Sequence, residues 1–189
     1  MRRRRLPRRP IIRPAIPGGI AQGPRRQLLR AHQLLESGHH DEAANIFENL
    51  ARAAHDRGLT RHAPNLFLQA ARANILAGRL EAGKSLIFEG LEIFSQAERW
   101  PALARSGQRI VDELNQLGQG NIAAEVESWL AKTLPEPLDS YTQPPQKSAR
   151  PLPLKCPFCG GVLRPGEVEM LDQFTGECPY CGSAVREDE

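Results

Sequence analysis

The sequence lacks the segments that would carry a protein into or across a membrane. No stretch approaches the roughly 18 apolar residues of a membrane-spanning helix. The start, MRRRRLPRRPIIRPAIPGG, has the positive charge of a secretory leader, but arginine and proline interrupt its apolar stretch too early. Cysteine is scarce, with four in 189 residues. We therefore expect a cytoplasmic protein without an integral membrane segment, whose cysteines stay reduced.

Acidic residues are absent from residues 1–30, which carry ten arginines. The rest of the chain holds 15 basic and 22 acidic residues, so the formal net charge of +3 divides into +10 and −7. Five prolines stand in residues 1–24, and each disfavours helix in the residue before it. We expect a disordered Arg/Pro-rich arm over this stretch.

The arm is open to several interpretations. Residues 2–13 could contact nucleic-acid phosphates or an anionic membrane surface, and Arg4-x-x-Pro7-x-x-Pro10 fits a basic proline-rich ligand. No aromatic residue stands among the arginines to stack on bases. A plain disordered extension without a role is the remaining interpretation.

Residues 25–133 have the composition of helices, because Ala, Leu, Glu, Gln and Arg are abundant and β-branched residues are few. Apolar residues recur at spacings of three and four, as one buried helical face requires. Pro64 and Pro101 stand where a helix is expected to begin, a position that tolerates proline. The expected helices span 25–36, 41–57, 64–77, 80–98, 101–117 and 120–133.

Three glycines, Gly38, Gly78 and Gly118, stand 40 residues apart and indicate a repeat. We expect each glycine to end one helix in a left-handed turn, so that each unit is a helical hairpin. A small residue five positions after each glycine would let the second helix approach the first closely. These small residues are Ala43, Gly83 and Ala123.

The three units resemble tetratricopeptide repeats, and Ala31, Gly38, Ala43 and Phe47 carry the best match. The period of 40 residues exceeds the usual one of about 34, and Glu127 occupies an aromatic position of the pattern. The resemblance implies a mainly α fold, a short solenoid whose concave face holds a protein or peptide partner. A plain six-helix bundle is the alternative. Candidates to line the groove are Arg52, Arg72, Arg79 and Arg109, which could equally be solvated.

Residues 134–154 hold six prolines and no apolar periodicity, which predicts a linker that tethers the segment 155–186. That segment contains two C-P-aromatic-C-G turns, and Gly160 and Gly182 close them. Two thiolates separated by two residues in a tight turn can both bind one tetrahedral ion. We therefore expect the two turns to form one metal site. Its ligands are Cys156, Cys159, Cys178 and Cys181.

This spacing resembles a zinc ribbon, which implies one structural Zn²⁺ and a small β fold. We expect Val162 to Arg164 to pair with Val168 to Leu171, with Phe174 to Glu177 as a third strand. Iron bound as in rubredoxins, and disulfides, are the alternatives. Four thiolates would close the shell of the ion, which predicts a structural and not a catalytic metal.

No catalytic or cofactor-binding residue is predicted elsewhere. The segment Gly78 to Ser85, GRLEAGKS, satisfies a phosphate-loop pattern, but a helical pattern precedes it instead of the required strand. The histidines are expected to be solvated surface residues. They are His32, His39, His40, His55 and His62.

Two functions are compatible with these features. The first is a non-enzymatic protein–protein interaction adaptor, in which the helical repeats bind a partner and the zinc ribbon supplies a second contact. The alternative is a nucleic-acid-associated protein that uses the basic arm and the ribbon.

Overall fold

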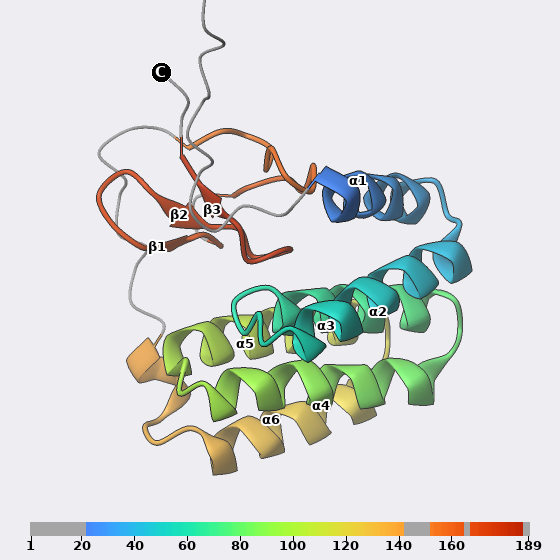
Figure 1. The fold of residues 1–189 in the computed structure, drawn as a ribbon. Coiled ribbons are helices and arrows are strands. Elements are labelled where there is room, and N and C mark those ends of the chain that lie inside the picture. The colour runs from blue at the N-terminus through green and yellow to red at the C-terminus, as the bar shows by residue number, and fades with distance from the viewer. Residues whose placement is uncertain (1–21, 142–151, 165–166, 187–189) are drawn as a thin grey trace, which may run out of the picture.

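The computed structural model describes residues 22–141, 152–164 and 167–186, which form six helices followed by a small antiparallel sheet (Figure 1). The predicted mainly α class with a small β segment is confirmed. The first helix begins three residues earlier than predicted, with Pro24 in its first turn. The helices are α1 (Gln22–Glu36), α2 (His40–Asp56), α3 (Ala63–Leu76), α4 (Leu80–Gln96), α5 (Trp100–Gln116), α6 (Gly120–Thr133) and the short 3₁₀ helix η1 (Leu138–Tyr141).

The turns between the helices share one geometry at intervals of 20 residues. Each has one residue with a φ between 53° and 82°, and the amide after that residue bonds a carbonyl five positions back. Such bonds satisfy the last carbonyls of the preceding helix. The predicted left-handed turns within the hairpins are confirmed, and two further turns of the same kind, between the hairpins, were not predicted. The five positions are Gly38, Gly58, Gly78, Glu98 and Gly118.

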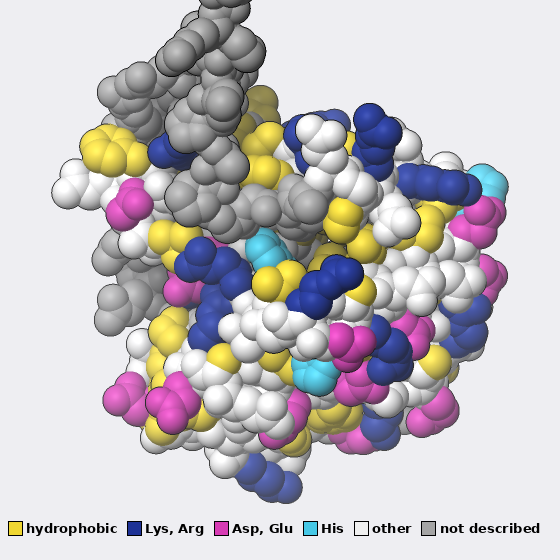
Figure 2. Space-filling model, viewed as in Figure 1, with side chains coloured by type: hydrophobic (Ala, Val, Ile, Leu, Met, Phe, Trp, Pro, Cys, Tyr) yellow, Lys and Arg dark blue, Asp and Glu magenta, His cyan; other side chains and the backbone are white. Residues whose placement is uncertain are grey.

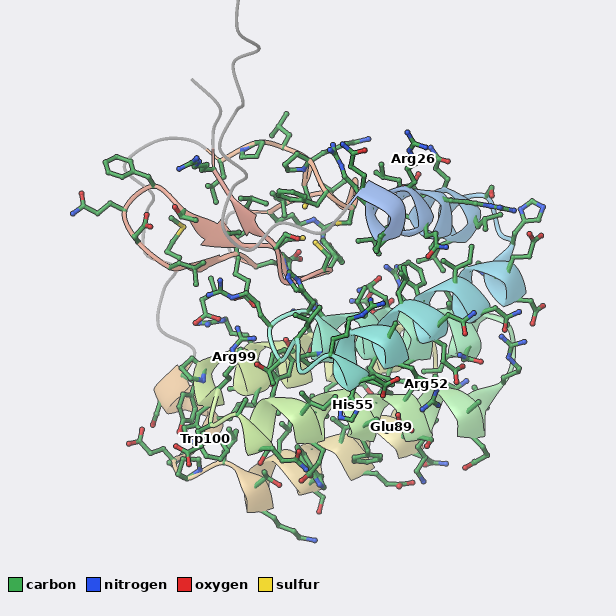
Figure 3. All side chains as sticks on the ribbon, viewed as in Figure 1. Arg26, Arg52, His55, Glu89, Arg99 and Trp100 are labelled. Atoms are coloured by element: carbon green, nitrogen blue, oxygen red, sulfur yellow. The ribbon has the colours of Figure 1, made fainter. Side chains whose placement is uncertain are left out.

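The helices pack in two layers. We call α1, α3 and α5 the first layer, and α2, α4 and α6 the second. Arg72 of α3 pairs with Glu113 of α5 within the first layer. Arg52 of α2 lies 3.6 Å from Glu89 of α4 in the second layer, and Figure 3 labels both side chains. The array therefore has two outer faces, one from each layer.

Small residues let α4 lie directly against α3. A Cβ added at Gly83 would be 3.0 Å from the carbonyl oxygen of Ala71, and one at Gly90 would be 3.0 Å from that of Pro64. The close approach predicted at Gly83 is thus present. A continuous core fills the space between the layers, and its largest buried side chains include Phe47, Leu68, Ile87, Phe94 and Leu103.

The sheet joins β1 (Glu169–Met170), β2 (Gly176–Glu177) and β3 (Ala184–Val185) in antiparallel order β1-β2-β3. The predicted hairpin between Val162 to Arg164 and Val168 to Leu171 is wrong for the described residues. Val162 instead bridges to Lys155, and β1 pairs with β2. Strands of two residues leave too little alternation for a sequence pattern to identify them.

The first part of the predicted linker lies against the helices. Leu134 is buried, and Leu138 and Tyr141 of η1 pack on the core. Residues 142–151 of the predicted linker and residues 1–21 of the predicted arm fall outside the described residues. At the end of the predicted linker, Leu152 again packs on the core. Among the residues that are described, none of the helices combines the length and apolarity needed to cross a membrane.

Candidate metal centre and the surface around it

The four cysteines come from two turns with the same backbone hydrogen bonds. In residues 156–161, the first knuckle, Cys156 N–H donates to Gly161 O and Gly160 N–H donates to Cys156 O. Gly160 has a φ of 79° and its counterpart Gly182 a φ of 68°, so the glycine after each second cysteine is needed for the turn. Residues 178–183, the second knuckle, repeat both bonds with Cys178, Gly182 and Ser183.

The four sulfur atoms gather in one buried cluster. All Sγ atoms lie within 4.8 Å of one another, and no cysteine is more than 2% exposed. The Sγ atoms of Cys156 and Cys181 are 3.8 Å apart, and those of Cys159 and Cys178 are 3.7 Å apart. Sulfurs about 2.3 Å from a tetrahedral ion would be about 3.8 Å apart. The cluster therefore has the dimensions of a four-thiolate metal site.

The chemistry of the sulfurs also favours a cation at their centre. Hydrogen bonding with Cys159 lowers the pKa of Cys156, and hydrogen bonding with Cys156 raises the pKa of Cys159 and of Cys181. Four thiols this close do not all ionise side by side without a compensating positive charge. A divalent cation would let all four ionise, because each thiolate would then face positive charge. The four cysteines could hold a metal ion in this way.

Groups next to the sulfurs are suited to orient them as ligands. Gly161 N–H donates to Cys159 Sγ at 3.4 Å, and Ser183 Oγ lies 3.3 Å from Cys181 Sγ. Ser183 is fully buried, so its hydroxyl would donate to an ionised Cys181. If all four sulfurs bind, no coordination position is left for water or substrate.

The second knuckle contacts the start of α3. His62 Nδ1 lies 2.7 Å from the carbonyl oxygen of Cys181, so a protonated Nδ1 donates to it. A Cβ added at Gly182 would be only 2.0 Å from the carbonyl oxygen of Arg61. Knuckle and helix therefore meet backbone to backbone. A helix N-terminus carries partial positive charge, which favours a negative metal–thiolate cluster beside it.

A buried carboxylate joins the sheet to two helix ends. Glu177 of β2 is 5% exposed, and its oxygens lie 3.0 Å from Arg61 Nε and 2.7 Å from Arg99 Nη2. Figure 3 labels Arg99, which lies between α5 and the sheet. Two guanidinium groups are the kind of partners that a buried carboxylate requires. The pair of contacts holds β2 over the starts of α3 and α5.

Further contacts extend over α5. Arg109 Nη2 donates to Pro179 O at 2.9 Å, and its guanidinium carbon lies 5.5 Å from the centre of the Tyr180 ring. Arg105 pairs with Glu169 at 2.7 Å. We call the described residues 152–164 and 167–186 the ribbon. The sequence predicts a ribbon tethered by a linker, whereas the structure packs these residues against the first layer, beside α1 and above α5 (Figure 1).

The apolar composition of α3 indicates that a further part of the chain covers this helix. Twelve of its 14 residues are buried, and Arg72 is its only charged residue. A surface helix normally keeps one polar face, so a helix that is apolar nearly all round is covered on both sides. Here α2 and α4 cover one side and the ribbon covers part of the other.

Two of the histidines predicted to be solvated are not. His62 binds the second knuckle, and His32 of α1 packs edge-on against Phe47 and Tyr180, with ring centres 5.1 and 6.1 Å away. Burial lowers the pKa of His32 from 6.5 to about 4, with a smaller lowering by Arg72 and an opposing effect of Cys156. His32 is therefore neutral at pH 7.

We predict that His32 makes the stability of the fold depend on pH. Between pH 6.5 and about 4 the unfolded chain binds a proton that the folded chain does not, so the free energy of unfolding falls as the pH falls. The loss should reach about 3 kcal/mol across this window. Urea unfolding followed by circular dichroism should show a shallower pH dependence for His32→Leu than for the unchanged protein. Equal slopes in both proteins would contradict the prediction, since loss of metal at low pH affects both alike.

A cavity of about 550 Å³ lies between the first layer and the ribbon. All three helices of the layer contribute to its walls, together with both knuckles. Arg72 and Arg109, two of the predicted groove arginines, line it. The other two do not line it: Arg52 of α2 pairs with Glu48, and Arg79, the N-cap residue of α4, pairs with Asp41. Other lining residues are Glu36, Gln69, Asp112, Val162 and Tyr180.

The phosphate-loop pattern falls in a helical hairpin. Gly78 forms the turn after α3, and Gly83, Lys84 and Ser85 lie inside α4. Lys84 pairs with Glu125 of α6. No strand precedes this segment in the described chain, so the glycines serve the turn and the helix contact instead.

Comparison with known proteins adds no relative: no family model, no curated protein and no solved structure matches this chain.

Proposed function

We propose that this chain is a non-enzymatic adaptor that binds a protein or peptide partner on a surface shared by its helices and its ribbon. In this proposal the helical hairpins are tetratricopeptide-like repeats, and one structural Zn²⁺ ion stabilises the ribbon. Four free cysteines suit a reducing compartment, so we propose a cytoplasmic location.

Three features support the likeness to tetratricopeptide repeats. The turns at Gly38, Gly78 and Gly118 repeat every 40 residues, and each is followed five positions later by a buried small residue. Alternate helices form the two layers, and ion pairs join neighbours within each layer. Such an arrangement presents one helix of every hairpin on the same face, where repeat proteins bind partners.

The dimensions of the sulfur cluster support zinc as the metal. A closed tetrahedral shell of four thiolates suits Zn²⁺, and it also suits iron, so elemental analysis must decide between them. A closed shell would leave the ion without a reactive position. Within the described residues, this cluster is the one group of cysteines, histidines and carboxylates found to be arranged for a metal.

The observation that carries the adaptor proposal is the cavity of about 550 Å³ between the two parts. The ribbon covers the N-terminal ends of α3 and α5, and the cavity lies over the later turns of the same helices. A peptide bound there would touch apolar walls at Leu68 and Ile110 and polar groups at Gln69 and Arg109. Mixed walls of this kind are typical of sites that hold a peptide in one orientation.

Site-specific photo-crosslinking tests the adaptor proposal. We would place a photoreactive amino acid at Val162 or at Gln116, which line the cavity from the ribbon and from α5. Exposed Glu92 of α4, in the second layer, is the matched control position. We expect the two cavity positions to capture the same partner in cells, as identified by mass spectrometry, and Glu92 not to capture it. Capture of that partner only from Glu92, or equally from all three, would contradict the proposal.

A further inference from the structure

Two segments of this chain contain several basic residues and no acidic residue. Residues 1–35 hold ten arginines, and residues 140–166 hold Lys147, Arg150, Lys155 and Arg164. Together the two segments contain 14 of the 25 basic residues and none of the 22 acidic residues. More than a hundred residues separate them along the sequence.

The structure brings the described parts of these segments together. The guanidinium carbon of Arg25 lies 5.8 Å from the centre of the Phe158 ring in the first knuckle. A Cβ added at Gly160 would be 3.2 Å from Leu29 Cδ2, so the first turns of α1 lie directly on the knuckle. Figure 2 shows basic side chains in dark blue over α1, with hydrophobic side chains in yellow next to them.

We call the exposed side chains of Arg25, Arg26, Arg30 and Lys155 the basic face. Arg30 lies 3.9 Å from Glu42 and is 69% exposed, which makes a weak pair. Arg25, Arg26 and Lys155 have no carboxylate within 4.0 Å among the described residues. Among the residues that the structure describes, the weak pair with Glu42 is therefore the only ion pair of the basic face.

Apolar side chains are exposed beside these charges. Leu154 is 83% exposed and Val162 is 47% exposed, on the two backbone segments that pair at Lys155. Phe158 is partly exposed next to Arg25. Exposed apolar groups among cations suit a ligand with both negative charge and flat apolar surfaces.

We propose that the basic face binds single-stranded nucleic acid, with its cations on the phosphates and with Leu154 and Phe158 against the bases. Single strands expose their bases to such contacts, whereas a duplex offers mainly phosphates to a surface of this size. All ten cations of residues 1–35 are arginines, whose planar fork matches a phosphate in two hydrogen bonds. This inference does not depend on the adaptor function.

A membrane surface fits the basic face less well. The apolar stripe of α1, formed by Leu28, Ala31 and Leu35, is buried in the helical array and cannot insert among lipids. Leu154 and Val162, the two exposed apolar residues that flank the first knuckle, supply little area for insertion.

The test uses the full-length, zinc-loaded protein and fluorescence anisotropy of a labelled uridine oligonucleotide of about 20 nucleotides, titrated at several salt concentrations. The variant combines Arg25→Gln, Arg26→Gln and Lys155→Gln. The matched control neutralises three exposed cations elsewhere, with Arg57→Gln, Lys132→Gln and Arg186→Gln. We expect the basic-face variant to bind about tenfold more weakly and to lose about 2 from the salt slope, at 0.7 for each phosphate contact. The control should bind as the unchanged protein does.

A second variant tests the contact with bases. Leu154→Ser changes a side chain that is 83% exposed, so the fold should tolerate it. It should weaken binding of the single strand about threefold while leaving binding of a duplex unchanged.

Several results would overturn the inference. One is unchanged binding in the basic-face variant, which would assign all affinity to the arginines of residues 1–21. Another is an equal loss in the control variant. Stronger binding to phosphatidylserine vesicles, or equal binding to polyglutamate, would replace nucleic acid with a membrane or an acidic protein.

Discussion

Replacing Cys156 and Cys178 together with serine is expected to reduce the bound metal from one ion per chain to none and to unfold the ribbon. The double change removes one thiolate from each knuckle, and the described strands have only two residues each. Metal binding supplies about 10–16 kcal/mol to folding in comparable small zinc modules. Without it, a ribbon of this size cannot bury enough apolar surface to remain folded.

The six helices should remain folded in the same variant. Neighbouring helices pack on one another along the whole array, and their buried side chains form a core from Leu28 to Leu134. The ribbon only continues this core, with residues such as Leu163 and Val185. Because the buried face of α3 would lose its cover, we expect the melting temperature of the helices to fall while the helical circular dichroism at low temperature persists. A chelator should have the same effect on the unchanged protein.

Elemental analysis and circular dichroism check this prediction together. One zinc ion per chain in the unchanged protein, and none in the variant, is the expected result. A red protein that contains iron would overturn the assignment of the metal. Loss of most helical signal on chelation would show that the helices need the ribbon in order to fold, against what we expect.

Gly182→Ala is expected to release the ribbon from α3 without removing its metal. The new Cβ would lie 2.0 Å from the carbonyl oxygen of Arg61, a backbone atom that cannot move without the helix end. Separation would break the bond from His62 to Cys181 and the pairs of Glu177 with Arg61 and Arg99. We expect a loss of about 3 kcal/mol, at the upper end of what single substitutions usually cost.

The first knuckle offers a matched control. Gly160→Ala introduces the same left-handed strain, at a φ of 79°, but its Cβ would meet only the movable end of Leu29, at 3.2 Å. Its cost should stay near 1–2 kcal/mol, the usual penalty for a side chain in this conformation. Hydrogen exchange at the start of α3 is the measurement. Faster exchange there in Gly182→Ala alone supports the contact, and equal exchange in both variants would contradict it.

The helix starts, several of the turns and the cysteine cluster could be predicted from the sequence. Gly38, Gly78 and Gly118 predict left-handed turns because only glycine adopts that conformation at little cost, and Pro64 and Pro101 predict helix starts. Glu98 escaped prediction for the same reason, since it takes up a turn that its side chain disfavours, at a φ of 53°. The cluster of four sulfurs was predicted from the two cysteine pairs, because the spacing within each turn places both of its sulfurs on the same side.

The position of the ribbon on the helices was decided only by the tertiary structure. The sequence by itself determined the helices, the spacing of the glycine turns and the two cysteine turns, because each depends on residues a few positions apart. The bond between His62 and Cys181 joins residues 119 positions apart, and no local pattern distinguishes such a histidine from a solvated one. Likewise Glu177 becomes a buried partner of Arg61 and Arg99 only when three separate segments meet. Such contacts depend on the charge and shape of side chains that become neighbours only in the folded chain. A single sequence does not show which residues far apart along it will lie next to each other.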